Sequence, residues 1–182
     1  SEYLKAAQRQ NSQVKPLLPP DNCQATDPNL SHAIEVLGKQ LQTNDCVVFV
    51  NPNTPQGQWI ASDELVELLT VIEQKQGWCI VDESFLPFIS LALADSCRQW
   101  LNQFQRLIVL QSLTKYYACP GVRIGALLTN HTSLKNQLNW VWGLSCFDHL
   151  WLWHALQDTT HARRTQQWLQ HEKPRFFHAL RA

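Results

Sequence analysis

Apolar residues recur along this chain in short continuous runs, separated by longer segments in which they repeat at helical spacing. The continuous runs predict buried strands at 46–50, 78–81, 107–110 and 122–128. The spaced segments predict helices at 2–11, 30–41, 65–72 and 90–104, the third of them with Ser62 as its N-cap. Strands and helices that alternate in this way predict an α/β fold, a three-layer α/β/α arrangement around a mostly parallel sheet.

The two ends of the chain carry weaker patterns. Val14 to Leu18 predicts a short strand that stops at the following prolines, and the polar run from 21 to 29 predicts a loop. From about His131 the pattern is helical to the end, with a break near Gly143. The chain therefore divides into an α/β part, 1–130, and a helical segment, 131–182, that is rich in tryptophan.

Composition narrows the class of protein. The chain has 182 residues, of which 45% are hydrophobic, which is enough for one core. With 15 basic and 15 acidic side chains it has no formal net charge, which argues against binding nucleic acid. No apolar stretch approaches the roughly 20 residues that span a membrane. Methionine is absent even from position 1, so we expect a processed start or a piece of a longer protein.

Cysteine and histidine give no support for a metal site. The six cysteines form no C-x-x-C pair, which argues against zinc and against a redox dithiol. Unpaired cysteines of this kind indicate a reducing, cytoplasmic compartment. His149 and His154 are five residues apart and diverge on a helix, so we expect no metal.

Polar and charged residues follow three of the predicted strands. The first strand runs into Asn51–Gly57, the second into Asp82–Phe85 and the third into Gln111–Lys115. Open α/β sheets bind ligands beyond the carboxyl ends of their strands, so these segments predict one site at a shared rim. Taken singly, an aspartate at a strand end is most often a turn former, and a lone lysine a solvated charge. No G-x-G-x-x-G follows any strand, which excludes simple dinucleotide binding.

The same segments resemble a known family. Asn51-Pro52-Asn53, Asp82-Glu83-Ser84-Phe85 and Ser112-x-x-Lys115-x7-Arg123-x-Gly125 are similar to the motifs of fold-type-I, pyridoxal-phosphate-dependent enzymes of the class I/II aminotransferase group. Within that group, the stretch 112–123 looks most like threonine-phosphate decarboxylases of cobalamin biosynthesis, with histidinol-phosphate aminotransferases as near relatives. The resemblance implies that 1–130 is part of the cofactor-binding large domain. It also implies that 131–182 leads toward a small domain that this chain lacks.

The resemblance assigns roles to individual residues. It implies that Lys115 bonds covalently to the cofactor's aldehyde and moves protons, and that Asp82 lies beside the pyridine nitrogen. It also implies that Arg123, Ser112 and Thr114 hold the cofactor's phosphate.

Two positions near the expected cofactor ring depart from the family pattern. Thr54 follows Asn53 where the family usually has a second asparagine, which bonds the ring hydroxyl. Phe85 stands where the aminotransferases commonly have a tyrosine that bonds the same oxygen. Threonine-phosphate decarboxylases resemble this chain in having phenylalanine there, so Phe85 favours the decarboxylase.

Three hypotheses follow for the function. The first is a pyridoxal-phosphate enzyme, or a fragment of one, that decarboxylates a small phosphorylated amino acid. The second is an aminotransferase of the histidinol-phosphate type. The third is a non-catalytic fragment or interaction module of the same fold, which Thr54 and the missing ends motivate. Members of the family are about twice this length and are homodimers, so we also expect this chain to associate.

Overall fold

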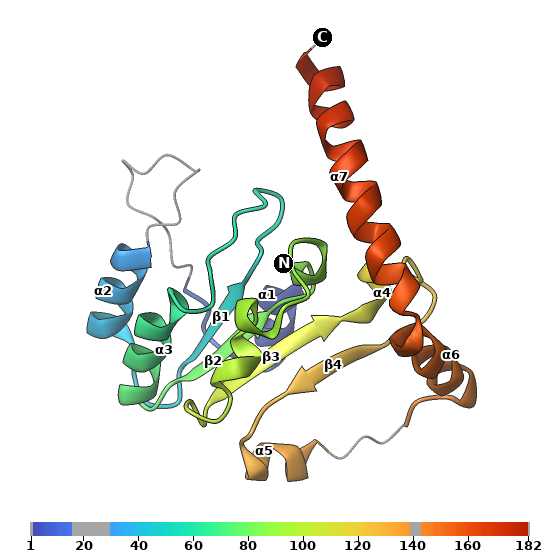
Figure 1. Ribbon diagram of the computed structural model, residues 1–182. Coiled ribbons are helices and arrows are strands. Elements are labelled where there is room, and N and C mark those ends of the chain that lie inside the picture. Colours follow the sequence, from blue (N-terminus) through green and yellow to red (C-terminus); the bar gives the residue numbers. More distant parts are fainter. Residues whose placement is uncertain (1, 16–29, 139–142, 182) are drawn as a thin grey trace.

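A four-stranded sheet forms the centre of the computed structural model, which describes residues 2–15, 30–138 and 143–181 (Figure 1). Its strands are β1 (Cys46–Val50), β2 (Trp78–Asp82), β3 (Leu107–Ser112) and β4 (Gly125–Leu128). They lie in the order β1-β2-β3-β4. The first three strands are parallel, and β4 runs antiparallel to β3. The prediction of an α/β fold with a mostly parallel sheet is therefore confirmed.

Helices occupy most of the predicted segments. The α-helices are α1 (Glu2–Arg9), α2 (Leu30–Gln40), α3 (Leu65–Gln74), α4 (Leu113–Tyr116), α5 (Thr132–Gln137), α6 (Cys146–Gln157) and α7 (Thr159–Arg181). Three 3-10 helices lie between β2 and β3, namely η1 (Leu86–Phe88), η2 (Leu93–Asp95) and η3 (Cys97–Trp100). Val14 and Lys15 are not in a strand. The remainder of the strand predicted at 14–18, and the loop predicted at 21–29, lie outside the described residues.

The single helix predicted over 90–104 is wrong, since this segment contains short 3-10 turns. The backbone is extended at Ser96, with φ −103° and ψ 140°, so no α-helix can continue through it. Two groups at this break bind the buried carboxylate of Glu83: the Ser96 hydroxyl donates to one oxygen at 2.5 Å and the Cys97 N–H to the other at 2.6 Å. A tertiary contact has overridden the local helical spacing.

The N-cap predicted at Ser62 is also wrong. Helix α3 has Glu64 as its N-cap. The Ser62 hydroxyl instead donates to the carbonyl oxygen of Ala94 at 2.6 Å and accepts from the amide of Gln99 at 2.6 Å. Ser62 therefore ties the start of α3 to the segment of 3-10 turns.

The fourth strand begins three residues later than predicted. Gly125 pairs with Ser112 in the register of β3 and β4. A Cβ at Gly125 would lie 2.9 Å from the carbonyl oxygen of Gln111. Only glycine fits this close approach of two backbones, and it marks where β4 joins the sheet.

The hydrophobic core lies between the sheet and the helices α2 and α3, which are side by side in Figure 1. Leu68 and Ile72 of α3 belong to one buried cluster with Val81 of β2 and Val109 of β3. Helical spacing gives α3 its apolar face, and continuous apolar runs give the strands theirs.

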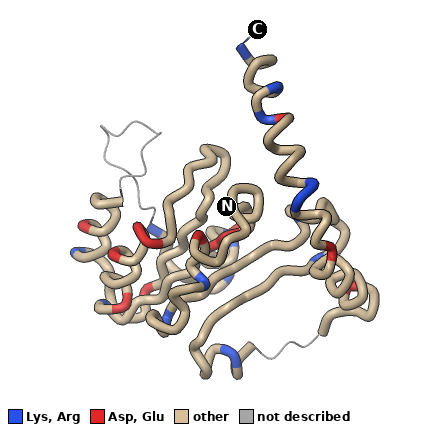
Figure 2. The backbone as a smooth tube through the Cα atoms, viewed as in Figure 1, with Lys and Arg blue, Asp and Glu red and all other residues tan. Residues whose placement is uncertain are grey.

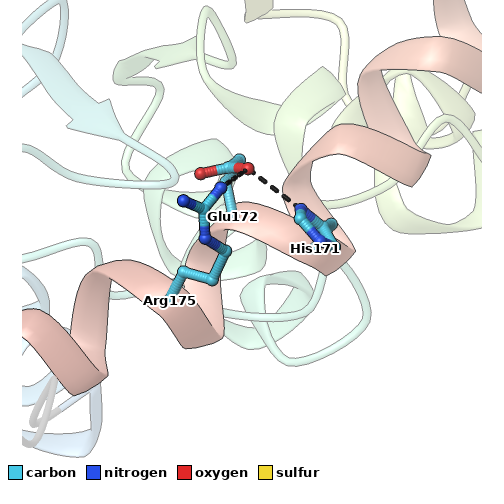
Figure 3. Close-up of polar contacts among 3 residues, drawn as sticks. All are labelled: His171, Glu172 and Arg175. Atoms are coloured by element: carbon cyan, nitrogen blue, oxygen red, sulfur yellow. Dashed lines mark hydrogen bonds and ion pairs between the residues drawn. The ribbon is translucent and has the colours of Figure 1, made fainter.

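The last two helices lie apart from this core. Neither α6 nor α7 has a buried residue, and α7 extends away from the sheet toward the C-terminus (Figure 1). Within α7, Glu172 forms ion pairs with His171 at 2.9 Å and with Arg175 at 2.6 Å (Figure 3). The hydrogen bond from His171 lowers the pKa of Glu172. These pairs are exposed and contribute little to stability.

Charge is spread over the molecule. Figure 2 shows acidic and basic positions distributed over several elements, including α2, α3 and α7. Across the described segments, no helix is both long enough and apolar enough to cross a membrane.

Candidate active site

The carboxyl ends of the parallel strands bring three sequence segments to one edge of the sheet. In the register of the strands, Val50 pairs with Asp82, and Asp82 pairs with Leu110. The segments that follow these three residues therefore start side by side. This is the edge at which open α/β sheets bind ligands.

Asp82, the last residue of β2, has both carboxylate oxygens engaged. Its Oδ1 accepts from the backbone N–H of Ser84 at 2.9 Å and from the Ser84 hydroxyl at 2.5 Å. Its Oδ2 accepts from the hydroxyl of Tyr3 at 2.5 Å, although Tyr3 lies 79 residues earlier in the chain. Burial, then the hydrogen bond to Asp82, raises the pKa of Tyr3, so its phenol stays protonated and acts as the donor.

A chain of hydroxyl groups continues from Asp82 toward β3. The Ser84 hydroxyl, which donates to Asp82, accepts from the backbone N–H of Ser112 at 3.0 Å. The hydroxyls of Ser112 and Thr114 are 3.0 Å apart. The two predicted phosphate-holding hydroxyls are thus neighbours, and a buried serine joins them to the predicted ring-binding acid.

Lys115 lies on α4, the short helix that begins directly after Ser112. Its Nζ is 5.0 Å from the centroid of the Phe85 ring, within the range of a cation–π contact. Phe85 comes from the turn after Asp82, so the amine and the acid belong to the same edge of the sheet. The side chain of Lys115 is exposed and open to a ligand.

The remaining predicted site residues do not join this network. The amide of Asn53 is used within its own turn, where it donates to the side chain of Gln58 and accepts from the Gln58 N–H, both at 2.8 Å. Thr54 and Arg123 are exposed. Among the described residues, Arg123 has no hydrogen bond or ion pair, but it lies two residues before Gly125, which pairs with Ser112.

Two tyrosines follow Lys115, and their rings pack within the protein. Tyr116 is buried and has edge-to-face contacts with Phe88, Tyr117 and His161, with centroids 5.1 to 5.4 Å apart. His161 also stacks on Tyr117, with centroids 4.9 Å apart. Desolvation raises the pKa of both tyrosines. The contacts of His161 with Tyr116 attach the start of α7 to α4.

Sequence reasoning missed Tyr3 and the role of Ser84. Ser84 lies two residues after Asp82, the spacing at which an aspartate side chain bonds the backbone ahead of it, so a local signal existed. Nothing near Tyr3 in the sequence indicates Asp82 as its partner, because their contact depends on the tertiary fold. In the described part of the chain, no three His, Cys, Asp or Glu residues are grouped to hold a metal ion.

The donor set fits pyridoxal phosphate. A carboxylate has about four lone-pair positions, and the three donors on Asp82 leave one for a protonated ring nitrogen. Lys115 offers an exposed primary amine for an aldehyde, while Ser112 and Thr114 offer adjacent hydroxyls for a phosphate. The fold and the donor set at this edge define the class: an α/β domain of the kind that binds pyridoxal phosphate.

The chain belongs to the family of class I and II aminotransferases, whose model matches residues 1–178. Pyridoxal 5'-phosphate is the cofactor of this family. Structures of the same fold include a histidinol-phosphate aminotransferase from Sinorhizobium meliloti in complex with it, with a TM-score of 0.69 at 18% identity, covering 81% of this chain and 40% of that one.

Two named relatives represent different reactions. The chain is similar to threonine-phosphate decarboxylase of Salmonella typhimurium, with 29% identity over 99% of this chain and 48% of the relative. It is also similar to histidinol-phosphate aminotransferase of Pectobacterium atrosepticum, with 33% identity over 53% of this chain and 26% of the relative. The chain thus spans about half the length of the decarboxylase, and its match covers about a quarter of the aminotransferase.

Solved structures of both enzyme types share the fold of this chain. The histidinol-phosphate aminotransferase from Clostridium acetobutylicum superposes with a TM-score of 0.82 at 25% identity, covering 100% of this chain and 53% of that one. The L-threonine-O-3-phosphate decarboxylase from Porphyromonas gingivalis shares the fold, with a TM-score of 0.67 at 18% identity, over 93% of this chain and 48% of that one.

Proposed function

We propose that this chain is the cofactor-binding part of a pyridoxal-phosphate-dependent decarboxylase that acts on a small phosphorylated amino acid such as threonine phosphate. One observation carries the proposal: the Lys115 amine lies over the Phe85 ring, at the sheet edge where Asp82 ends β2. The match to a threonine-phosphate decarboxylase over 99% of the chain supports it. So does Phe85, where the aminotransferases commonly have a tyrosine.

Each residue of the site has a part in this proposal. Asp82 would accept a hydrogen bond from the protonated ring nitrogen, Lys115 would bond the cofactor and move protons at the substrate's α-carbon, and Ser112, Thr114 and Arg123 would hold the phosphate. Asn53 and Thr54, in the turn after β1, would lie near the ring, although the Asn53 amide is bonded to Gln58. When bound, the cofactor supplies an electron sink for the charge that develops on the α-carbon.

The larger assembly is part of the same proposal. Residues 1–130 would belong to the large domain, and 131–182 would lead toward a small domain. The enzyme would be a cytoplasmic homodimer. Exposed apolar side chains on α6 and α7 support association, since such surfaces are covered in stable assemblies. Sedimentation of a clean monomer would count against the dimer.

An aminotransferase of the histidinol-phosphate type is the second candidate, favoured by the TM-score of 0.82 with such an enzyme. The two reactions differ in the bond that breaks at the α-carbon. A decarboxylase breaks the bond to the carboxylate, whereas an aminotransferase loses the hydrogen to Lys115. The third candidate, a non-catalytic module, needs neither step.

An absorbance titration with pyridoxal phosphate tests the proposal. We expect a shifted band in the chain that disappears in Lys115→Ala and persists in Lys135→Ala, because Lys135 is an exposed lysine of α5, away from the site. Borohydride reduction followed by peptide mass mapping should place the trapped cofactor on Lys115. Equal spectra for all three proteins, repeated with the full gene product, would favour the non-catalytic module.

The product that forms distinguishes the two candidate reactions. Release of carbon dioxide from threonine phosphate, without transfer of an amino group, would support the decarboxylase. Transfer of the amino group of histidinol phosphate to a keto acid would support the aminotransferase.

A further inference from the structure

Asp82 is held by two side chains that approach it from different parts of the chain. Ser84 donates twice to Oδ1 from the turn after β2, while Tyr3 of α1 donates to Oδ2 from the other side. A carboxylate with donors on both oxygens cannot rotate without losing a hydrogen bond. Its orientation is therefore set before any ligand arrives.

Ser84 connects this acid to the segment that carries Lys115. Ser84 is 5% exposed, and its hydroxyl donates its single proton to Asp82 and accepts from the N–H of Ser112. Ser112 is in turn the N-cap of α4. Replacing Ser84 by alanine would remove a donor from Asp82 and leave the N–H of Ser112, in a partly buried place, without its hydroxyl partner.

Tyr3 contributes a different kind of contact. It is partly buried, and its hydroxyl reaches Asp82 from a helix with no buried residue of its own. The hydrogen bond therefore ties α1 to the site as much as it orients the acid.

We propose that Tyr3 and Ser84 are positioning residues that hold Asp82 for the cofactor's ring nitrogen and link it, through Ser112, to the helix of Lys115. This inference rests on the proposed function, since it assigns Asp82 to the ring nitrogen. Three donors occupy three of the carboxylate's about four lone-pair positions, and the ring nitrogen takes the fourth. Neither Tyr3 nor Ser84 needs to contact the cofactor.

The test uses variants that each remove one hydroxyl. In Tyr3→Phe and in Ser84→Ala we expect the affinity for pyridoxal phosphate to fall roughly tenfold, the effect of one lost charge-assisted hydrogen bond. The pH midpoint of the Lys115-dependent absorbance band should also shift. Ser84→Thr keeps the hydroxyl and should restore both. Thr129→Val is the control, since it removes a buried hydroxyl that bonds the carbonyl oxygen of Leu107, outside the site.

A second measurement needs no cofactor. In the apo chain, the effects of Tyr3→Phe and of Ser84→Ala on the urea midpoint should each be non-additive with that of Asp82→Asn, because each pair shares a hydrogen bond. Additive effects, together with cofactor affinity and pH midpoint equal to those of Thr129→Val, would overturn the inference while leaving the proposed function intact. If neither the unsubstituted chain nor the full gene product forms the Lys115-dependent band, the proposed function is overturned, and the inference falls with it.

Discussion

The sheet with α2 and α3 differs from the two C-terminal helices in what holds each in place. Residues of α3, β2 and β3 form one buried cluster, in which Leu65, Leu68 and Leu107 are 1% exposed. Helices α6 and α7 have no buried residue, while Trp153 and Trp168 are 60% and 62% exposed. The first region contains its own core. The C-terminal helices instead expose large apolar side chains to solvent.

This difference in packing explains why the candidate site lies at the edge of the sheet and not on the C-terminal helices. Asp82, Ser84 and Ser112 lie at strand ends that a packed core fixes in register, so their hydrogen bonds can be specific. The start of α7 is attached to that region through His161, whose Nε2 is 3.0 Å from the carbonyl oxygen of Tyr116. Beyond it, α7 extends away from the sheet (Figure 1).

The largest difference between the regions should appear on truncating one large side chain in each. We expect Leu68→Ala to lower the free energy of unfolding by about 2–5 kcal/mol, because it leaves a cavity in the core. Trp168→Ala should change it by no more than about 0.5 kcal/mol, since its side chain is largely in solvent. Urea denaturation measures both. A comparable loss for Trp168→Ala would mean that a second copy covers α7, and sedimentation of that variant would reveal it.

A smaller but sharper effect should come from the glycine where β4 joins β3. We expect Gly125→Ala to destabilise the chain by about 1–3 kcal/mol, because the added Cβ would overlap the carbonyl oxygen of Gln111 and neither backbone can yield. Gly121→Ala is the matched control, since a Cβ there would meet nothing within 4 Å. Thermal melts of the two variants should differ clearly. Equal melts would show that β4 can move away from β3.

The smallest effect should be a pH dependence that Glu83 confers on the core. Burial raises the pKa of Glu83 above its ordinary value of 4.5, although bonds from Ser96 and Cys97 oppose the shift. A carboxyl group with a raised folded-state pKa gives stability that is present below pH 4.5 and is lost as pH rises through that folded-state pKa.

Glu83→Gln tests this dependence, because the amide does not titrate. The stability of the unsubstituted chain relative to the variant should be greatest below pH 4.5 and decline as the pH rises above it. Urea midpoints of the two proteins across this range give the difference. A difference that is constant or grows with pH would contradict the assignment to Glu83.

Much of the fold follows from local pattern. The runs at 46–50, 78–81 and 107–110 became parallel strands, and Val81 and Val109 of the second and third strands are buried in the core. Once the strands are parallel, their carboxyl ends must share an edge. The placement of Asp82, Ser112 and Lys115 at that edge could therefore be anticipated from their position after the strands.

Other features depended on contacts between distant residues. Local spacing predicts a helix over 90–104, but buried Glu83 binds Ser96 and Cys97, and the backbone is extended at Ser96. Ser62 was expected to cap α3, but its hydroxyl donates instead to the carbonyl oxygen of Ala94.

Sequence thus determined the strands and the edge at which they end, because both depend on residue type and on spacing of a few positions, whereas the roles expected of Lys115 and Asp82 came from the resemblance to a known family. The tertiary structure alone decided that Tyr3 donates to Asp82 and that the side chain of Asn53 bonds Gln58. A buried polar group must find a partner wherever the folded chain supplies one, and that partner can lie 79 residues away.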